Sequence, residues 1–250
     1  MKNIVLTLML LACLISCKKN EINGEDVADY FIPLQNGKYI TYRLDSTVFL
    51  ENGRSEVTNS YQEKHLVRED FKDNQGRTSY WIDRFIRDVN GTQAWKLASV
   101  YYVTPTNNSI EVTENRLRTI ALLGPIKKDL SWKGNFNMSK KPYSDMYNFS
   151  NDNEMDNWDF IVKENHSSET INGKIYNQVL LISHVNELVN IPITNPSAFA
   201  SKTVSFEKYA KGIGLVYQER ALWEYQPNPG VNNTPYKVGF EVKRSIIDHN

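Results

Sequence analysis

Apolar and polar residues alternate with a period of two through most of the chain after residue 30. In the stretch 38–50, Ile40 and Tyr42 fall on one face and Thr41 on the other, and the stretch 236–242 repeats the pattern. Such alternation is typical of half-buried β-strands, because successive side chains of a strand point to opposite faces of its sheet. Further runs of β-branched or aromatic residues, which also predict strands, cover 80–82, 95–103, 158–163, 179–185 and 214–225.

Asn-Gly pairs mark the turns between several of these runs. Asn-Gly suits the tight turn of a β-hairpin because both central residues adopt positive φ there. We expect hairpins at Asn52-Gly53, around Asn74–Gly76 and at Asn90-Gly91. The stretch 38–103 is therefore predicted to form a four-stranded antiparallel meander.

Helical patterns are scarce. The windows 67–73 and 188–202 are weak candidates, and Pro192 and Pro196 argue against the second, because proline interrupts a helix. The sequence therefore predicts an all-β fold with very little helix. We expect an antiparallel meander sheet that curves into a barrel or half-barrel, with a β-sandwich as the alternative, since both need alternating faces.

Length and charge are those of an ordinary globular protein. The chain has 250 residues, with 29 lysines and arginines against 29 acidic residues, so its net charge is zero. A nucleic-acid-binding protein would be expected to carry a clustered basic excess, and no such partner is predicted. No Pro/Ser linker divides residues 30–250, which we interpret as one all-β domain with its best seam in the polar stretch 133–157.

The N-terminus has the organisation of an export signal. Lys2 precedes an apolar run at 4–15, which is shorter than the roughly 20 residues of a membrane-spanning helix. Leu14-Ile15-Ser16-Cys17 follows and resembles the lipobox of bacterial lipoproteins. The resemblance implies that residues 1–16 are a lipoprotein signal peptide and that Cys17 carries thioether-linked lipid and an acyl chain such as palmitate. The protein would then be attached to a membrane through Cys17.

Both cysteines of the chain lie in this segment. A competing lipobox ends at Cys13, but Leu14 and Ile15 would then leave apolar residues at the mature start. The mature domain is predicted to contain neither a disulfide nor a cysteine–metal site. The polar stretch 17–29 is interpreted as a flexible tether. The residue after Cys17 is not Asp, which by analogy with enteric bacteria favours the outer membrane and leaves its face undecided.

Three further stretches resemble a loose group of uncharacterised lipoproteins from Bacteroidetes-type bacteria. They are 31–34 together with Gly37, 172–179 and 209–216. The resemblance spans most of the mature chain and implies an all-β envelope lipoprotein. It offers no activity and no catalytic residues that could be transferred to this sequence.

Catalytic motifs are not recognisable. The Ser-x-x-Lys match at 205–208 has no companion motif, and no His-Glu-x-x-His motif occurs. His184 lies on an apolar strand and is interpreted as a core histidine. The sequence predicts neither an enzyme nor a cofactor. Histidines occur at four separate positions: His65, His166, His184 and His249.

An acidic stretch deserves consideration as a calcium loop. Asp152, Glu154 and Asp156 have the 1, 3, 5 spacing of an EF-hand loop. Asn157 and Lys163 stand where that loop requires Gly and Glu, so a solvated acidic loop is the favoured interpretation and no metal is predicted.

Two tryptophans are candidates for ligand binding. Core packing or cross-strand pairing is the default for a tryptophan on a strand, but Trp132 and Trp158 border the polar stretch 133–157 and are the candidates for an exposed stacking platform for a sugar ring. The leading functional expectation is a lipid-anchored envelope protein with a non-catalytic binding or scaffolding role. The alternatives are a carrier of a lipid or small apolar ligand in a barrel cavity, and a glycan-binding module. Its partner would be a glycan, a lipid or another envelope protein.

Overall fold

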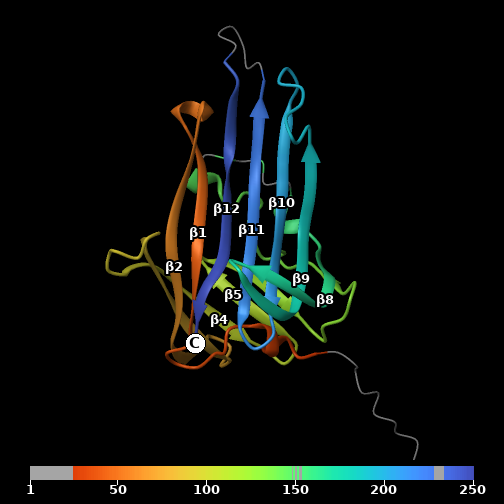
Figure 1. The fold of residues 1–250 in the computed structure, drawn as a ribbon. Helices are drawn as coiled ribbons and strands as arrows, with labels where there is room; N and C mark the ends of the chain where they lie inside the picture. Colours follow the sequence, from red (N-terminus) through yellow and green to blue (C-terminus); the bar gives the residue numbers. More distant parts are fainter. Residues whose placement is uncertain (1–24, 148, 150, 152–153, 228–233) are drawn as a thin grey trace, which may run out of the picture.

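The computed structural model describes residues 25–147, 149, 151, 154–227 and 234–250. Within them, twelve antiparallel strands form one sheet in the order β6-β5-β4-β3-β2-β1-β12-β11-β10-β9-β8-β7 (Figure 1). The strands are β1 Tyr39–Leu50, β2 Ser55–Lys72, β3 Thr78–Asp88, β4 Lys96–Pro105, β5 Ser109–Glu114, β6 Leu117–Leu123, β7 Ser131–Trp132, β8 Phe160–Ile171, β9 Lys174–Val189, β10 Ala200–Ala210, β11 Gly214–Gln226 and β12 Tyr236–His249.

Tight turns connect most neighbouring strands, as the Asn-Gly pairs predict. The β1–β2 connection is a short 3-10 turn, η2 (Glu51–Gly53), in which Asn52 and Gly53 have φ values of 57° and 86°. Asn-Gly tolerates this left-handed backbone better than other pairs. Strands β1 to β4 form the predicted four-stranded meander.

The two ends of the sheet meet and almost close it into a barrel. Ile120 of β6 donates its backbone N–H to the carbonyl of Gly134, which follows β7, over 2.8 Å. The indole Nε1 of Trp132 donates to the carbonyl of Ile120 over another 2.8 Å. These bonds use backbone groups that an open sheet edge would leave unpaired. The structure confirms the predicted all-β meander and its barrel form.

Two segments enter the barrel from outside the sheet. The 3-10 turn η1 (Val27–Tyr30) lies at the end of the barrel where the described chain begins (Figure 1). The stretch 133–157, with its short helix α2 (Ser144–Tyr147) and 3-10 turn η3 (Met155–Asn157), packs aromatic rings against the sheet. The ring of Tyr147 stacks on that of Phe240 with centroids 4.1 Å apart.

Residues 25–29 depart from the tether that their polarity predicts. Glu25 forms a β-bridge with Ile126, and its carboxylate accepts a 2.5 Å hydrogen bond from the hydroxyl of Tyr30. Val27 and Tyr30 are buried. Two apolar side chains within a polar segment are enough to bind it to the core.

The two helical windows are wrong. Residues 67–73 belong mainly to β2, and 188–202 contains the end of β9, a connection and the start of β10. In β2 the pairing with β3 shifts register between Val67 and Asp70. Such a bulge interrupts the period of two, which explains why this strand looked irregular in the sequence.

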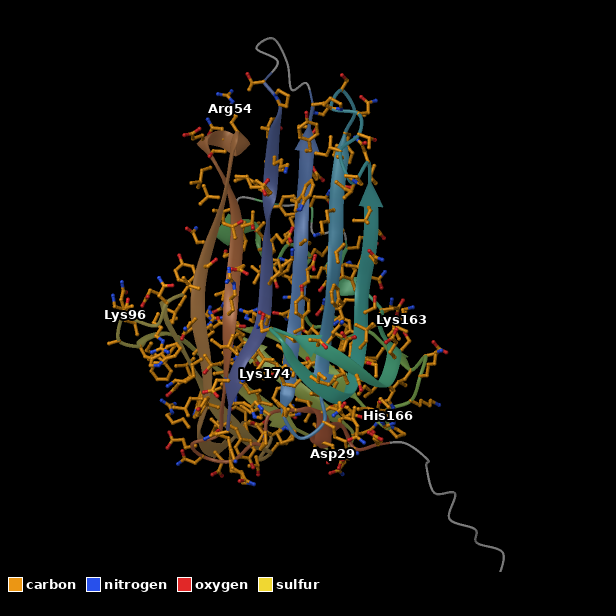
Figure 2. All side chains as sticks on the ribbon, viewed as in Figure 1. Asp29, Arg54, Lys96, Lys163, His166 and Lys174 are labelled. Carbon is orange, nitrogen blue, oxygen red and sulfur yellow. The ribbon has the colours of Figure 1, made fainter. Side chains whose placement is uncertain are left out.

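Charged side chains of both signs cover the outside of the molecule. Figure 2 shows Arg54 at one end of the barrel and Asp29 at the other. On the outer face Lys202 lies 2.8 Å from Glu219 and 3.3 Å from Glu241. Among the described residues, no helix is long and apolar enough to cross a bilayer.

Candidate functional site: a barrel cavity with apolar and polar lining

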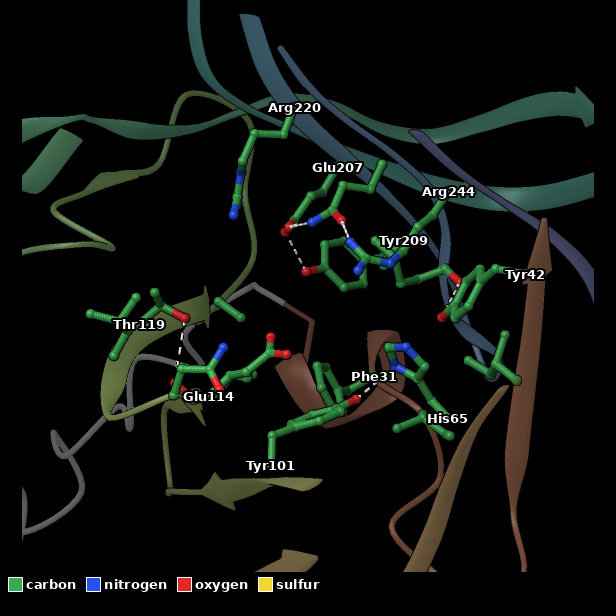
Figure 3. A pocket seen from close by; sticks show the side chains of 18 of the residues that line it. Phe31, Tyr42, His65, Tyr101, Glu114, Thr119, Glu207, Tyr209, Arg220 and Arg244 are labelled. Atoms are coloured by element: carbon green, nitrogen blue, oxygen red, sulfur yellow. Dashed lines mark hydrogen bonds between the residues drawn. The ribbon is translucent and has the colours of Figure 1, made fainter. Parts of the chain in front are cut away.

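The barrel contains a partly enclosed cavity of about 190 Å³. Its lining includes Phe31 and Ile32 of the N-terminal segment and Met138 and Tyr143 of the 133–157 segment. Figure 3 shows Phe31 together with lining side chains from the sheet. The apolar lining also includes Ile40, Val112, Leu117, Ala121 and Leu215, whereas the polar lining includes Glu114, Glu207, Gln218, Arg220 and Arg244.

The register of three adjacent strands aligns three of the polar lining residues. Glu207 of β10 is paired with Gln218 of β11, and Gln218 is paired with Arg244 of β12. Residues paired directly across strands project on the same face and interact. The side-chain amide of Gln218 donates to Glu207 Oε1 over 2.5 Å, and its oxygen accepts from Arg244 Nη1.

This row continues at both ends. Arg244 Nε donates to Glu63 Oε2 over 2.5 Å, although Glu63 lies on β2, beyond β1. At the other end, the hydroxyl of Tyr209 donates to Glu207 Oε2 over 2.5 Å. We call these five residues, Glu63, Arg244, Gln218, Glu207 and Tyr209, the polar row.

The polar row holds its carboxylates in the ionised form. Burial would raise the pKa of Glu63, but the neighbouring Arg244 and His65 outweigh it and keep that pKa well below the usual range. Burial acts the same way on Glu207, and its neighbours His184 and Arg220, with the two hydrogen bonds it accepts, leave its pKa lowered. Both groups therefore carry negative charge at neutral pH.

Two histidines contact the row. The Nδ1 of His65 is 2.9 Å from the hydroxyl of Tyr101, and its Nε2 is 3.2 Å from Glu63 Oε2. His184 is buried, stacks on Phe160 at 3.7 Å between centroids, and has Nδ1 2.9 Å from the hydroxyl of Ser205. Burial lowers the pKa of His184 to about 4, so its ring is neutral at pH 7. The prediction of a core histidine at 184 is confirmed.

Arg220 differs from the other polar groups of the cavity. Its Nη1 donates to the hydroxyl of Tyr143 over 2.6 Å. Its Nε is buried and has no hydrogen-bond partner among the described residues. Figure 3 shows the side chain extending from β11 toward the space between Glu207 and Thr119.

The predicted exposure of Trp132 and Trp158 is wrong. Their exposed fractions are 7% and 6%, so neither ring is available as a platform for a sugar. Trp132 closes the barrel edge and packs against Phe160 at 5.7 Å between centroids. The prediction failed because the polar stretch that the two residues border folds against the sheet instead of lying in solvent.

The remaining tryptophans are partly exposed, and each has a cation over its ring. Lys64 and Arg87 lie 4.8 and 4.2 Å from the ring centroid of Trp95. Lys237 lies 4.7 Å from that of Trp223. Trp81 stacks on Phe71 at 4.6 Å, with Arg68 at 5.9 Å. These contacts cover ring faces that a sugar would need.

Other predicted site residues give less information. Asp152 of the acidic loop lies outside the described residues, as does the lipidation candidate Cys17 with the whole stretch 1–24. Glu154 and Asp156 are described, and within the part of the chain that the structure covers no group of three acidic, histidine or cysteine residues is placed to hold a metal ion.

The cavity residues were missed in the sequence, although a signal existed. Gln218 and Arg220 alternate with the same period as Val216 and Leu222, which are buried. A polar residue on the apolar face of a predicted strand indicates either a paired core group or a site. Which of the two applies depends on partners from other strands.

Comparisons with known proteins find only distant structural similarity. No family model matches it, and no curated protein does. A protein from Bacteroides fragilis, described as exported and as having a YmcC-like fold, has 12% identity and a TM-score of 0.38, covering 88% of this chain and 100% of its own. A Parabacteroides distasonis protein described as a lipoprotein has 10% identity and a TM-score of 0.33, covering 88% and 99%.

A third solved structure, a DUF1329 family protein from Desulfovibrio piger, has 9% identity and a TM-score of 0.19, covering 87% of each chain. With all three TM-scores below 0.5, these likenesses are distant. The function of this chain must be argued from its own residues.

Proposed function

We propose that this chain is a lipid-anchored protein of the cell envelope that binds a small ligand, without catalysis, in its barrel cavity. The observation that carries the proposal is the lining of the cavity, which combines apolar side chains with a limited set of charged and polar ones. Binding sites for small molecules commonly combine an apolar lining with a few oriented polar groups. A purely structural core would exclude most of these polar groups.

The volume of the cavity limits the ligand. At about 190 Å³ it is smaller than the roughly 300–1,000 Å³ of sites for drug-sized ligands. An engineered cavity of about 150 Å³ binds benzene. We therefore propose a ligand about the size of one substituted ring, and not a lipid with long acyl chains.

The chemistry of the polar row is poorly suited to general-acid catalysis. A general acid needs a carboxyl group that is protonated near neutral pH. The lowered pKa values of Glu63 and Glu207 leave both without a proton, and their oxygens accept hydrogen bonds from Arg244, Gln218 and Tyr209. Groups held in this way orient a ligand or one another.

A cavity-filling variant tests the binding proposal. Ala121 lines the cavity, so Ala121→Trp would place a large ring inside it. We expect benzyl alcohol, benzamide and benzoate to show saturation-transfer NMR signals with the full-length protein and to lose them with Ala121→Trp. The matched control is Ala98→Trp, because Ala98 is exposed on β4. Signals that Ala121→Trp leaves unchanged would contradict binding in the cavity.

The lipid anchor is tested separately. We expect an alkyne analogue of palmitate to label the wild-type protein and the Cys13→Ala variant, and both to sediment with outer-membrane vesicles. Cys17→Ala should remain unlabelled and leave the membrane fraction, because the lipobox at 14–17 places the modified sulfur at residue 17. Labelling of Cys17→Ala would refute this anchor and leave the cavity proposal standing.

A further inference from the structure

Three arginines on adjacent or nearby strands reach the interior of the barrel, and they differ in their partners. Arg244 lies 2.5 Å from a carboxylate oxygen of Glu63. Arg84 lies 2.6 Å from Glu114 and 3.6 Å from Glu63. Among the described residues, no carboxylate oxygen lies within 4 Å of the Arg220 guanidinium, whose described hydrogen bond is to the hydroxyl of Tyr143.

Not all of the N–H donors of Arg220 have a hydrogen-bond acceptor. A guanidinium carries five N–H groups in a planar fork. One of them is used by Tyr143, and the buried Nε has no partner in the described part of the chain. Glu207 lies close enough to act electrostatically on Arg220, yet both of its oxygens already accept hydrogen bonds, from Gln218 and Tyr209.

A buried guanidinium N–H without a hydrogen-bond acceptor is costly, and cations with such free donors commonly bind an anion. Burial lowers the pKa of Arg220, but Tyr143 and Glu207 more than compensate and raise it, so the side chain stays charged. The guanidinium fork matches a carboxylate through two parallel hydrogen bonds.

The surroundings restrict the anion. The described interior has three carboxylates, of Glu63, Glu114 and Glu207, for its three arginines. A doubly charged phosphate ester would add excess negative charge near Glu207. A singly charged group adds the least, and the apolar residues of the lining, among them Leu117 and Ala121, favour an organic body attached to it.

We propose that Arg220 binds the carboxylate of a small organic acid whose apolar part, about the size of one ring, fills the cavity. This inference rests on the proposed function, because it assigns the ligand class of the same cavity. Arg220 is then the residue that selects an acid over its neutral analogue.

The test compares benzoate with benzamide, which has the same shape and no charge. We expect the full-length protein to bind benzoate with a Kd below about 1 mM and at least about tenfold more tightly than benzamide, in line with the strength of charge-assisted hydrogen bonds. Arg220→Met should remove this preference and leave benzamide binding within about twofold. Arg220→Lys, which keeps the charge, should retain part of it.

The matched control is Arg43→Met, since Arg43 is an exposed arginine on β1 that pairs with Asp45. It should leave both affinities unchanged. Thermal unfolding confirms that each variant is folded, and Arg220→Lys serves as the second variant if Arg220→Met fails to fold. Two single-group probes, acetate and inorganic phosphate, should bind much more weakly than benzoate.

The outcomes separate this inference from the proposed function. Equal binding of benzoate and benzamide, blocked by Ala121→Trp, would overturn the role of Arg220 and leave a cavity for neutral ligands. Binding of acetate or phosphate as tight as that of benzoate would overturn the organic-acid assignment. If no single-ring probe binds, the proposed function fails and this inference fails with it.

Discussion

Arg244 and Arg220 lie on neighbouring strands and face the same cavity, yet their surroundings are opposite. Arg244 joins Glu63 to Gln218 and is fixed at two ends. Arg220 meets Tyr143, and its Nε has no partner among the described residues. The comparison teaches that a buried charge by itself does not identify a binding residue. What matters is whether the protein already supplies its counter-charge.

Removing Arg244 from its ion pair with Glu63 should have the largest effect on stability. Arg244→Met leaves Glu63 buried without its main partner, and removing one member of a buried ion pair typically costs about 3–5 kcal/mol. We expect the free energy of unfolding in urea to fall by about that amount. The exposed control Arg43→Met should change it by less than about 1 kcal/mol. A loss below 1 kcal/mol in Arg244→Met would mean that the polar row is not rigidly paired.

His184 and the buried carboxylates should contribute to the free energy of unfolding in different pH ranges. The pKa of His184 is lowered from 6.5 to about 4, so the folded protein binds this proton less readily than the unfolded chain. The contribution of neutral His184 to the free energy of unfolding is complete above pH 6.5. It amounts to about 3 kcal/mol and is lost as the pH falls toward 4. Glu63, whose pKa is lowered from 4.5, loses its contribution only below that value.

The measurement is the free energy of unfolding at several pH values from 7 to 4. His184→Gln cannot titrate and should flatten the curve between pH 6.5 and pH 4.5, where Glu63 stays ionised. An unchanged slope in this variant would show that His184 is not the buried neutral base.

Replacing Gln218, in the middle of the polar row, should lower the free energy of unfolding by less than replacing Arg244. Gln218→Leu removes one hydrogen bond to Arg244 and one to Glu207, and leaves both charges buried. Unsatisfied buried groups cost about 1–3 kcal/mol, so urea unfolding should show a loss in this range. A neutral effect would indicate that water replaces the amide in solution.

The smallest effect on stability is expected for the substitution of Arg220. Arg220→Met removes no hydrogen bond or ion pair of a described carboxylate; it takes away a positive charge near Glu207, which keeps its hydrogen bonds from Gln218 and Tyr209. Only the hydroxyl of Tyr143 loses a partner. We expect the free energy of unfolding to change by less than about 1 kcal/mol, measured without added acid. A loss as large as that of Arg244→Met would make Arg220 a structural residue.

Local pattern was a good guide to the strands and a poor one to the site. The alternation at 38–50 and the Asn-Gly turns correctly predicted the meander, because both reflect interactions among residues close in sequence. The bulge after Val67 hid a strand, since it breaks the period of two. Trp132 and Trp158 were misjudged because burial depends on what packs against a residue, and polar neighbours in sequence do not report that.

The sequence by itself determined the all-β class, most strands and most hairpins of this protein, because the period of side chains and the φ preferences of Asn and Gly act locally. Only the tertiary structure decided which polar residues form a site. Glu63, Gln218 and Arg244 lie on three strands, and the register of the sheet brings their side chains together. The same register leaves Arg220 beside the cavity with no described carboxylate in ion-pair distance and with its Nε unpaired, which no pattern along the chain could show.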